Sequence, residues 1–356
     1  MYIYIISYIV LLCIAFFEFF EDRLKNQYLT IFLYTIILLF LIILSGARYN
    51  VGADFNSYLS IFNNVNSLSA DAPYSYLEPG FKLIIIFFKG TNFPPYFLFF
   101  VFSSILFSFL GVGIRRTSEL PFLSLFLFFL IFWIGYVFNV LRQGIAMSIF
   151  IYLIPDIKNK YFSKVLFFSL LASAIHFTGI FILFSYILYH FSFNKSVYVA
   201  VVVASVIYYF NSTSFFNLVV LLLPPGLDSK LIDYMSRFPG GVSLTSYLLR
   251  LIIVVIFLYF YNSLKKREGF TGVFNMYILG FLIYTFLSFQ SQAATRLNMF
   301  FRILEVILFP YLILIKKDKP QKIIMFCLVV AIASILFLSD LSSPHNVPFN
   351  FFWEVS

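Results

Sequence analysis

The sequence predicts an all-α integral membrane protein with about twelve transmembrane or half-membrane helices and two long outer loops. Of its 356 residues, 62% are hydrophobic and only 11% are charged, and the mean hydropathy is +0.97. A soluble domain of this length could not bury so much apolar surface. The apolar residues also occur in repeated runs of roughly 15 to 20, the length scale of membrane helices.

Each expected helix is an apolar run between polar loops. The helices cover residues 2–20, 28–45, 95–114, 120–138, 139–155, 163–175, 177–191, 196–210, 246–264, 273–289, 298–316 and 322–338. The two around His176 could instead be one long helix. Lys164 before them and Lys195 after them favour a hairpin, because cytoplasmic loops are rich in Lys and Arg and a hairpin keeps both ends on that side.

The chain holds no segment large enough for a soluble domain, so residues 1–356 are expected to form a single polytopic membrane domain. The outer loop 46–94 contains a short apolar stretch after Glu78-Pro79-Gly80. At about ten residues it is too short to span a bilayer, which predicts a re-entrant or interfacial helix. The outer loop 211–245 contains two Pro- and Gly-rich turns and is a candidate lid.

The net charge of +9 is attributed to positive-inside loops and anion-binding arginines, so no nucleic-acid partner is expected. The sequence has no Walker A motif, no Cys/His cluster for zinc and no DxD-like pair of acids for a divalent metal. These absences predict a protein that needs no metal, no cofactor and no ATP.

Arg142 and Gln143 lie where an apolar helix meets the outer side. An arginine inside a membrane helix costs free energy, so it needs a reason to be there. Arg142 could snorkel to the interface or pair with a structural carboxylate. Alternatively it binds an anion in an aqueous cavity, with Gln143 beside it.

Two further groups of polar residues lie on the outer side. Arg48, Asp54 and Tyr58 follow the second helix, where Arg48 and Asp54 could form a local ion pair or bind a phosphate and a sugar. Glu78 could cap the short helix or act as a general base. His176, at the hairpin turn, could be structural or catalytic.

Arg296 lies at the outer end of a late helix and is expected to line the same cavity. Several arginines that converge from separate helices on one membrane face suit a multiply charged anion, because guanidinium groups bind phosphate oxygens in pairs. A lipid carrier would hold a diphosphate at that depth.

Five short motifs resemble the EpsG-type bacterial polysaccharide polymerases, which group with the Wzy O-antigen and capsule polymerases. In order, they are Arg48-Tyr-Asn-x-Gly-x-Asp-x-x-x-Tyr58, Glu78-Pro-Gly-Phe81, Asn139-x-x-Arg-Gln-x-x-Ala146, Ala172-x-x-x-His-x-Thr178 and Arg296-x-x-x-Phe-Phe301. The sequence departs from the pattern in Thr178, where Ser is expected, and in Phe300, where Tyr is expected.

The resemblance implies a multi-pass enzyme of the bacterial inner (cytoplasmic) membrane whose active site faces the periplasm or the outside. It implies transfer of an undecaprenyl-diphosphate-linked glycan onto the non-reducing end of a new lipid-linked repeat unit, without a metal. Glu78 and His176 are then the catalytic candidates, and Arg48, Asp54, Tyr58, Arg142, Gln143 and Arg296 the substrate-binding ones. Membrane lipids are implied partners, and the resemblance allows a chain-length regulator.

Two other functions would use the same lipid-linked glycan. A flippase or transporter needs a cavity open to both leaflets and often an internal repeat, which the sequence does not show. An O-antigen ligase shares the donor but uses a different acceptor, and the sequence does not separate it from a polymerase.

Overall fold

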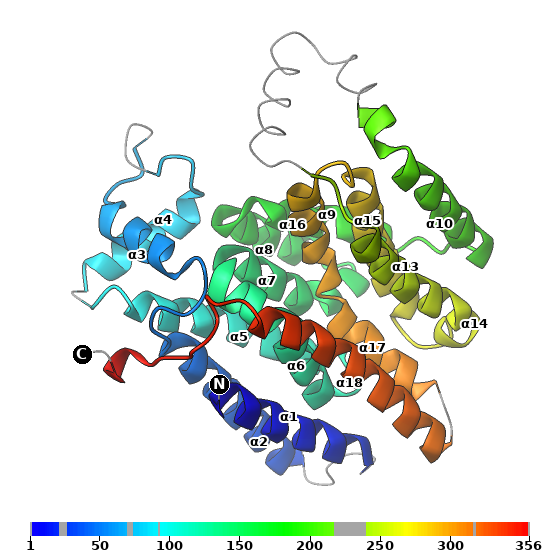
Figure 1. Cartoon of the computed structure of the whole chain (residues 1–356), viewed down its shortest axis with the longest axis horizontal. Helices are drawn as coiled ribbons and strands as arrows, with labels where there is room; N and C mark the ends of the chain where they lie inside the picture. The colour runs from blue at the N-terminus through cyan, green and yellow to red at the C-terminus, as the bar shows by residue number, and fades with distance from the viewer. Residues whose placement is uncertain are drawn as a thin grey trace. The chain divides into compact units, whose positions relative to one another are not determined.

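The computed structural model describes residues 2–20, 27–69, 74–91, 93–216, 240–315 and 318–354. These residues are almost entirely helical (Figure 1), which confirms the predicted all-α class. In the same ranges, the only strand-like pairing is a single antiparallel bridge between Arg48 and Phe351. The predicted lid at 211–245 falls mostly on residues 217–239, which lie outside the described residues.

The chain divides into two compact units, Met1–Tyr186 with Glu305–Ser356, and Ile187–Leu304. That these two units form the single polytopic membrane domain expected from the sequence stays a prediction. The first unit contains α1 (Tyr2–Phe20), α2 (Gln27–Gly46), α3 (Phe55–Asn64), α4 (Pro79–Lys89), α5 (Phe97–Thr117), α6 (Pro121–Phe128), η1 (Phe129–Asn139), α7 (Leu141–Lys158), α8 (Phe162–Ile175), η2 (Phe177–Ile180), α17 (Glu305–Leu314), α18 (Lys319–Leu341) and η3 (Phe352–Glu354).

The second unit contains α10 (Lys195–Phe210), α13 (Leu244–Tyr259), α14 (Tyr261–Leu264), α15 (Phe270–Phe286) and α16 (Ser291–Arg302), and the boundary falls inside α9 (Phe181–Tyr189). Within this unit α15 and α16 pack closely at Gly280, where a Cβ would lie 2.4 Å from the side chain of Phe301. Asn275 of α15 donates to the carbonyl of Phe191 at 2.7 Å, which ties the helix to the loop between α9 and α10.

Among the described residues, four helical stretches are long and apolar enough to cross a membrane, namely α2, α5, α6 continued by η1, and α18. A fifth would result if α16 and α17 form one broken span. The expected helix over 298–316 is thus wrong in its bounds: α16 begins at Ser291, because polar residues that hydropathy passes over are helical there, and a break separates Arg302 from Glu305. The total of about twelve membrane helices stays a prediction.

The hairpin around His176 is present in the structure. The helix α8 ends at Ile175, and α9 returns beside it, so that the Phe162 and Tyr186 rings lie 5.3 Å apart. Gly179 makes the turn close, because a Cβ there would lie 2.4 Å from the backbone nitrogen of Ser173. The hairpin therefore carries His176 at its tip.

The predicted short helix in loop 46–94 is α4, and Pro79 occupies its first turn, where a proline costs no hydrogen bond. This loop contains a second short helix, α3. The sequence did not predict it, because polar residues interrupt its apolar pattern. The C-terminal tail holds the start of the loop: Tyr49 donates to the Asn350 carbonyl at 2.8 Å, and Phe352 donates to the Ala47 carbonyl at 3.0 Å.

Candidate functional site

An ion pair between Arg142 and Glu78 forms the centre of the candidate site in the first unit. Arg142 is the second residue of α7, and Glu78 is the N-cap residue of α4. The guanidinium carbon also lies 5.2 Å from the centre of the Phe81 ring, a cation–π contact that fixes its position. Both side chains stay partly exposed, with 23% of Arg142 and 17% of Glu78 accessible. A ligand can therefore reach both groups.

Glu78 also connects the ion pair to the hairpin tip. Its second carboxylate oxygen accepts a hydrogen bond from the backbone N–H of Phe177 at 3.1 Å. The close approach depends on Gly80, because a Cβ there would lie 2.7 Å from the carbonyl oxygen of Ala174. The Glu78 carboxylate thus joins α4, α7 and the hairpin tip. The glycine of the Glu-Pro-Gly motif is needed because a side chain there would collide with the hairpin.

Tyr58 of α3 completes the polar cluster. Arg142 of α7 acts on the Tyr58 hydroxyl through its positive charge. Burial raises the pKa of Tyr58, while the charge of Arg142 lowers it and that of Asp54 raises it. Tyr58 therefore stays protonated, and Asp54, one turn earlier on the same segment, acts on the cluster through its charge.

His176 lies next to the Phe177 amide that Glu78 binds, and 9% of it is exposed. Its Nδ1 lies 2.7 Å from the Thr178 hydroxyl and accepts from the Thr178 backbone N–H at 3.4 Å. Since the backbone N–H can only donate, Nδ1 is an acceptor, and a neutral His176 carries its proton on Nε2. In this form the ring donates a hydrogen bond rather than accepts a proton.

Arg48 lies behind the cluster and is completely buried. Its Nη1, Nε and Nη2 donate to the carbonyls of Ser45, Val51 and Phe138 at 2.6, 3.3 and 3.4 Å. The rings of Phe99 and Phe138 lie 4.3 and 4.9 Å from its guanidinium carbon. Burial lowers the pKa of Arg48, and the carbonyls and ring faces stabilise its charged form. In this arrangement Arg48 holds the loop in place and does not reach an outside ligand.

We expect Arg48→Ala to remove folded protein rather than only activity. The change takes the guanidinium donor away from three carbonyl oxygens and empties an arginine-sized space, a loss of about 3–5 kcal/mol by analogy with other large-to-small substitutions in a core. The measurement is the amount of membrane-extracted protein that elutes as a single species, with its thermal unfolding midpoint. If the variant were as stable as the wild type but inactive, Arg48 would be a substrate-binding residue rather than a structural one.

The remaining predicted residues do not join the cluster in the same way. Gln143 follows Arg142 on α7 but is 1% exposed, so it faces the packed interior of the first unit. Arg296 is exposed on α16 in the second unit. Its place in a site with Arg142 stays a prediction.

Lys82 was missed by the sequence reading. It lies four residues after Glu78 on α4 and is only 4% exposed. Its side chain makes no hydrogen bond or ion pair to the part of the chain that the structure describes. The spacing was available as a signal, because residues i and i+4 share one face of a helix. Lys82 therefore places a second cation on α4, one helical turn after Glu78, with no ion pair to a carboxylate in those ranges.

Within the described residues, no group of three or more His, Cys, Asp or Glu side chains is placed to hold a metal ion.

The chain was also compared with known protein families, curated proteins and solved structures. Neither the curated proteins nor the solved structures gave a significant match to the chain. A model of the EpsG family matches residues 31–352, which is nearly the whole chain and the range in which all five motifs lie. The chain belongs to the EpsG family.

Proposed function

We propose that this protein is a polysaccharide polymerase that joins glycans carried on undecaprenyl diphosphate. EpsG-family membership and the apolar helices already indicate a membrane protein of polysaccharide biosynthesis. The finer proposal depends on one observation, the partly exposed ion pair of Arg142 with Glu78, which lies one helical turn before a further cation, Lys82. We place the protein in the bacterial cytoplasmic membrane, with this site facing outward.

The charge balance supports a diphosphate ligand. Glu78 neutralises Arg142, and within the described residues no carboxylate forms an ion pair with Lys82. A diphosphate brings at least two negative charges and several acceptor oxygens. Arg142 can bind it with two parallel N–H groups and Lys82 as a point charge.

The proposed reaction is a glycosyl transfer. A hydroxyl of the acceptor repeat unit attacks the anomeric carbon of the donor glycan, and a new C–O bond forms as the bond from that carbon to the diphosphate oxygen breaks. The proton of the hydroxyl goes to the protein, and undecaprenyl diphosphate leaves. The bond to a diphosphate supplies the free energy, so the step needs no ATP.

Each group of the cluster has a place in this step. In the resting structure Arg142 is paired with Glu78. A bound diphosphate would compete for Arg142 and release the Glu78 carboxylate to accept the proton. His176, with its proton on Nε2, would donate to a phosphate oxygen as negative charge develops there. Asp54 and Tyr58 are proposed to orient a sugar.

The test of the function is the surface glycan of a strain that lacks this chain. A polymerase predicts single repeat units on the outer surface in place of a ladder of lengths. Repeat units that stay on the cytoplasmic side would point to a flippase. A full ladder that stays on the lipid carrier would point to a ligase. Purified protein should then lengthen lipid-linked repeats without a nucleotide sugar.

Thr178 gives a conservative test of the His176 role. We expect Thr178→Ser to leave the glycan ladder unchanged, because the hydroxyl on His176 Nδ1 is kept. Thr178→Val has nearly the same volume but no hydroxyl, and we expect elongation to slow about fivefold, the value of one hydrogen bond. The measurement is the mean chain length at equal protein level. Equal chain lengths in both variants would show that elongation does not depend on the Thr178 hydroxyl, and would contradict the role given to His176 with its proton on Nε2.

A further inference from the structure

Asn139 opens the motif that contains Arg142, and the proposed function gives it no role. It is the last residue of η1, and Arg142 follows three residues later in the first turn of α7. Between the two helices, Val140 donates to the Gly135 carbonyl at 3.0 Å. The geometry of this short turn therefore sets the point from which the Arg142 side chain extends.

The Asn139 amide uses both of its polar atoms. Its Oδ1 accepts a hydrogen bond from the backbone N–H of Ala53 at 2.6 Å, and its Nδ2 donates to the Ile134 carbonyl at 3.1 Å. Because a backbone N–H can only donate and a carbonyl can only accept, the two partners fix the orientation of the amide. Asn139 thus joins η1 to the loop that leads into α3, and a side chain that only accepts cannot make both contacts.

The loop reaches this turn because of Gly52. Its φ is +97°, in the region that favours glycine, and a Cβ there would lie 2.8 Å from the Phe138 carbonyl oxygen. Phe55 donates to the Gly52 carbonyl at 3.2 Å, and Asp54 has a φ of −91° and a ψ of 2°. These values describe a type I turn with Ala53 at its second position. The residue that bonds to Asn139 therefore lies directly before the N-cap of α3.

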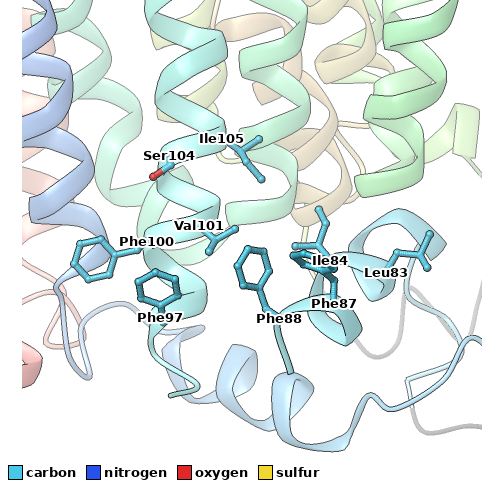
Figure 2. A pocket seen from close by; sticks show the side chains of 9 residues that line it. All are labelled: Leu83, Ile84, Phe87, Phe88, Phe97, Phe100, Val101, Ser104 and Ile105. Atoms are coloured by element: carbon cyan, nitrogen blue, oxygen red, sulfur yellow. The ribbon is translucent and has the colours of Figure 1, made fainter. Parts of the chain in front are cut away.

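The two outer helices of the polar cluster are held in different ways. Toward α5, α4 borders an apolar pocket of about 730 Å³, which leaves this face of the helix without close packing (Figure 2). The stacking of Phe81 on Phe102, with ring centres 5.2 Å apart, and the ion pair of Glu78 with Arg142 fix its start. Arg142 thus meets α4 directly, whereas Asn139 sets its position relative to α3.

We infer that Asn139 is a positioning residue, which holds the start of α3, with Asp54 and Tyr58, against the start of α7, with Arg142. The inference rests on the proposed function, in which these three side chains bind one lipid-linked glycan. Their spacing decides whether the diphosphate and the sugar can be bound at the same time. A misplacement of about 1 Å can slow an enzyme about 10²-fold even when it originates away from the reacting atoms.

The experiment measures the turnover of lipid-linked repeats by the full chain in lipid nanodiscs. Asn139→Ala removes both hydrogen bonds, and its turnover should fall about tenfold to a hundredfold. Asn139→Asp keeps the acceptor for the Ala53 N–H and should recover most of this loss. Ala53→Pro suits the second position of the turn but has no N–H to donate, so it should be as slow as Asn139→Ala. The double variant should be no slower than either single one, because both changes break the same contact.

Asn275→Ala is the matched control. Asn275 also joins a helix to a loop with both polar atoms, since its Nδ2 donates to the Phe191 carbonyl at 2.7 Å and its Oδ1 accepts from the Tyr198 hydroxyl. This change should lower the unfolding temperature and leave the turnover per folded molecule unchanged.

The possible outcomes separate the inference from the proposed function. If the losses in the double variant were additive, or if Asn139→Ala and Asn275→Ala both lost turnover only in step with their unfolding temperatures, Asn139 would be a structural residue. The polymerase proposal would then stand without it. If Asn139→Ala kept full turnover, the inference would also be wrong. A wild-type protein that lengthened no lipid-linked repeats would overturn both.

Discussion

Arg142→Ala should abolish the glycan ladder and leave single repeat units. The loss of one group that stabilises charge in the transition state slows an enzyme about 10²–10³-fold, enough to stop elongation within one cell cycle. Arg142→Lys should recover little, because an ammonium keeps the charge but not the two parallel N–H groups. The measurement is a gel of surface polysaccharide at matched protein level, together with the turnover of purified lipid-linked repeats.

Arg116→Ala is the control for this variant. Arg116 also pairs with a carboxylate, Asp156 at 3.1 Å, and also lies over an aromatic ring, that of Tyr152 at 5.1 Å. The Asp156 carboxylate also forms an ion pair with Lys164 at 2.9 Å. We expect this change to affect stability and not chain length. If both variants shortened the ladder equally, loss of an ion pair would explain the result. Arg142 would then have no specific role in binding the substrate.

Lys82→Met should stabilise the protein and inactivate it. Methionine keeps the apolar stem and removes a charge that has no counter-ion in the described part of the chain. Replacing a buried ion pair by apolar groups of similar size is often neutral or raises the free energy of unfolding by about 1–4 kcal/mol, and Lys82 has no ion-pair energy to lose in that part of the chain. Elongation should fall at the same time, because the diphosphate loses one of its two cations. Thermal unfolding without substrate and the glycan ladder measure the two effects.

Lys89→Met gives the opposite pattern and serves as the control. Lys89 lies on the same helix, but its ammonium donates to the carbonyls of Asn63 at 2.9 Å and Val65 at 3.2 Å. Its loss should therefore lower the unfolding temperature and leave elongation intact. A Lys82→Met protein that is both less stable and fully active would contradict the anion site, because it would make Lys82 a structural residue.

Much of the fold followed from hydropathy and charge alone. The apolar runs located most helices to within a few residues, and lysines at both ends predicted the hairpin around His176, which the structure contains. Hydropathy failed where helices are polar or short, as at α3 and the start of α16. Burial there depends on neighbours that are distant in sequence, and a local pattern carries no information about them.

The sequence by itself determined that this chain is a helical membrane protein, and its motifs identified the EpsG family and the segments that form the polar cluster. Only the tertiary structure decided which charges are accessible. Arg48 and Arg142 look alike in the sequence, yet Arg48 is enclosed by carbonyls and rings while Arg142 meets Glu78 at a surface that a ligand can reach. The physical reason is that the solvation of a charge is set by every group around it, and those groups come from four or more separate helices and loops.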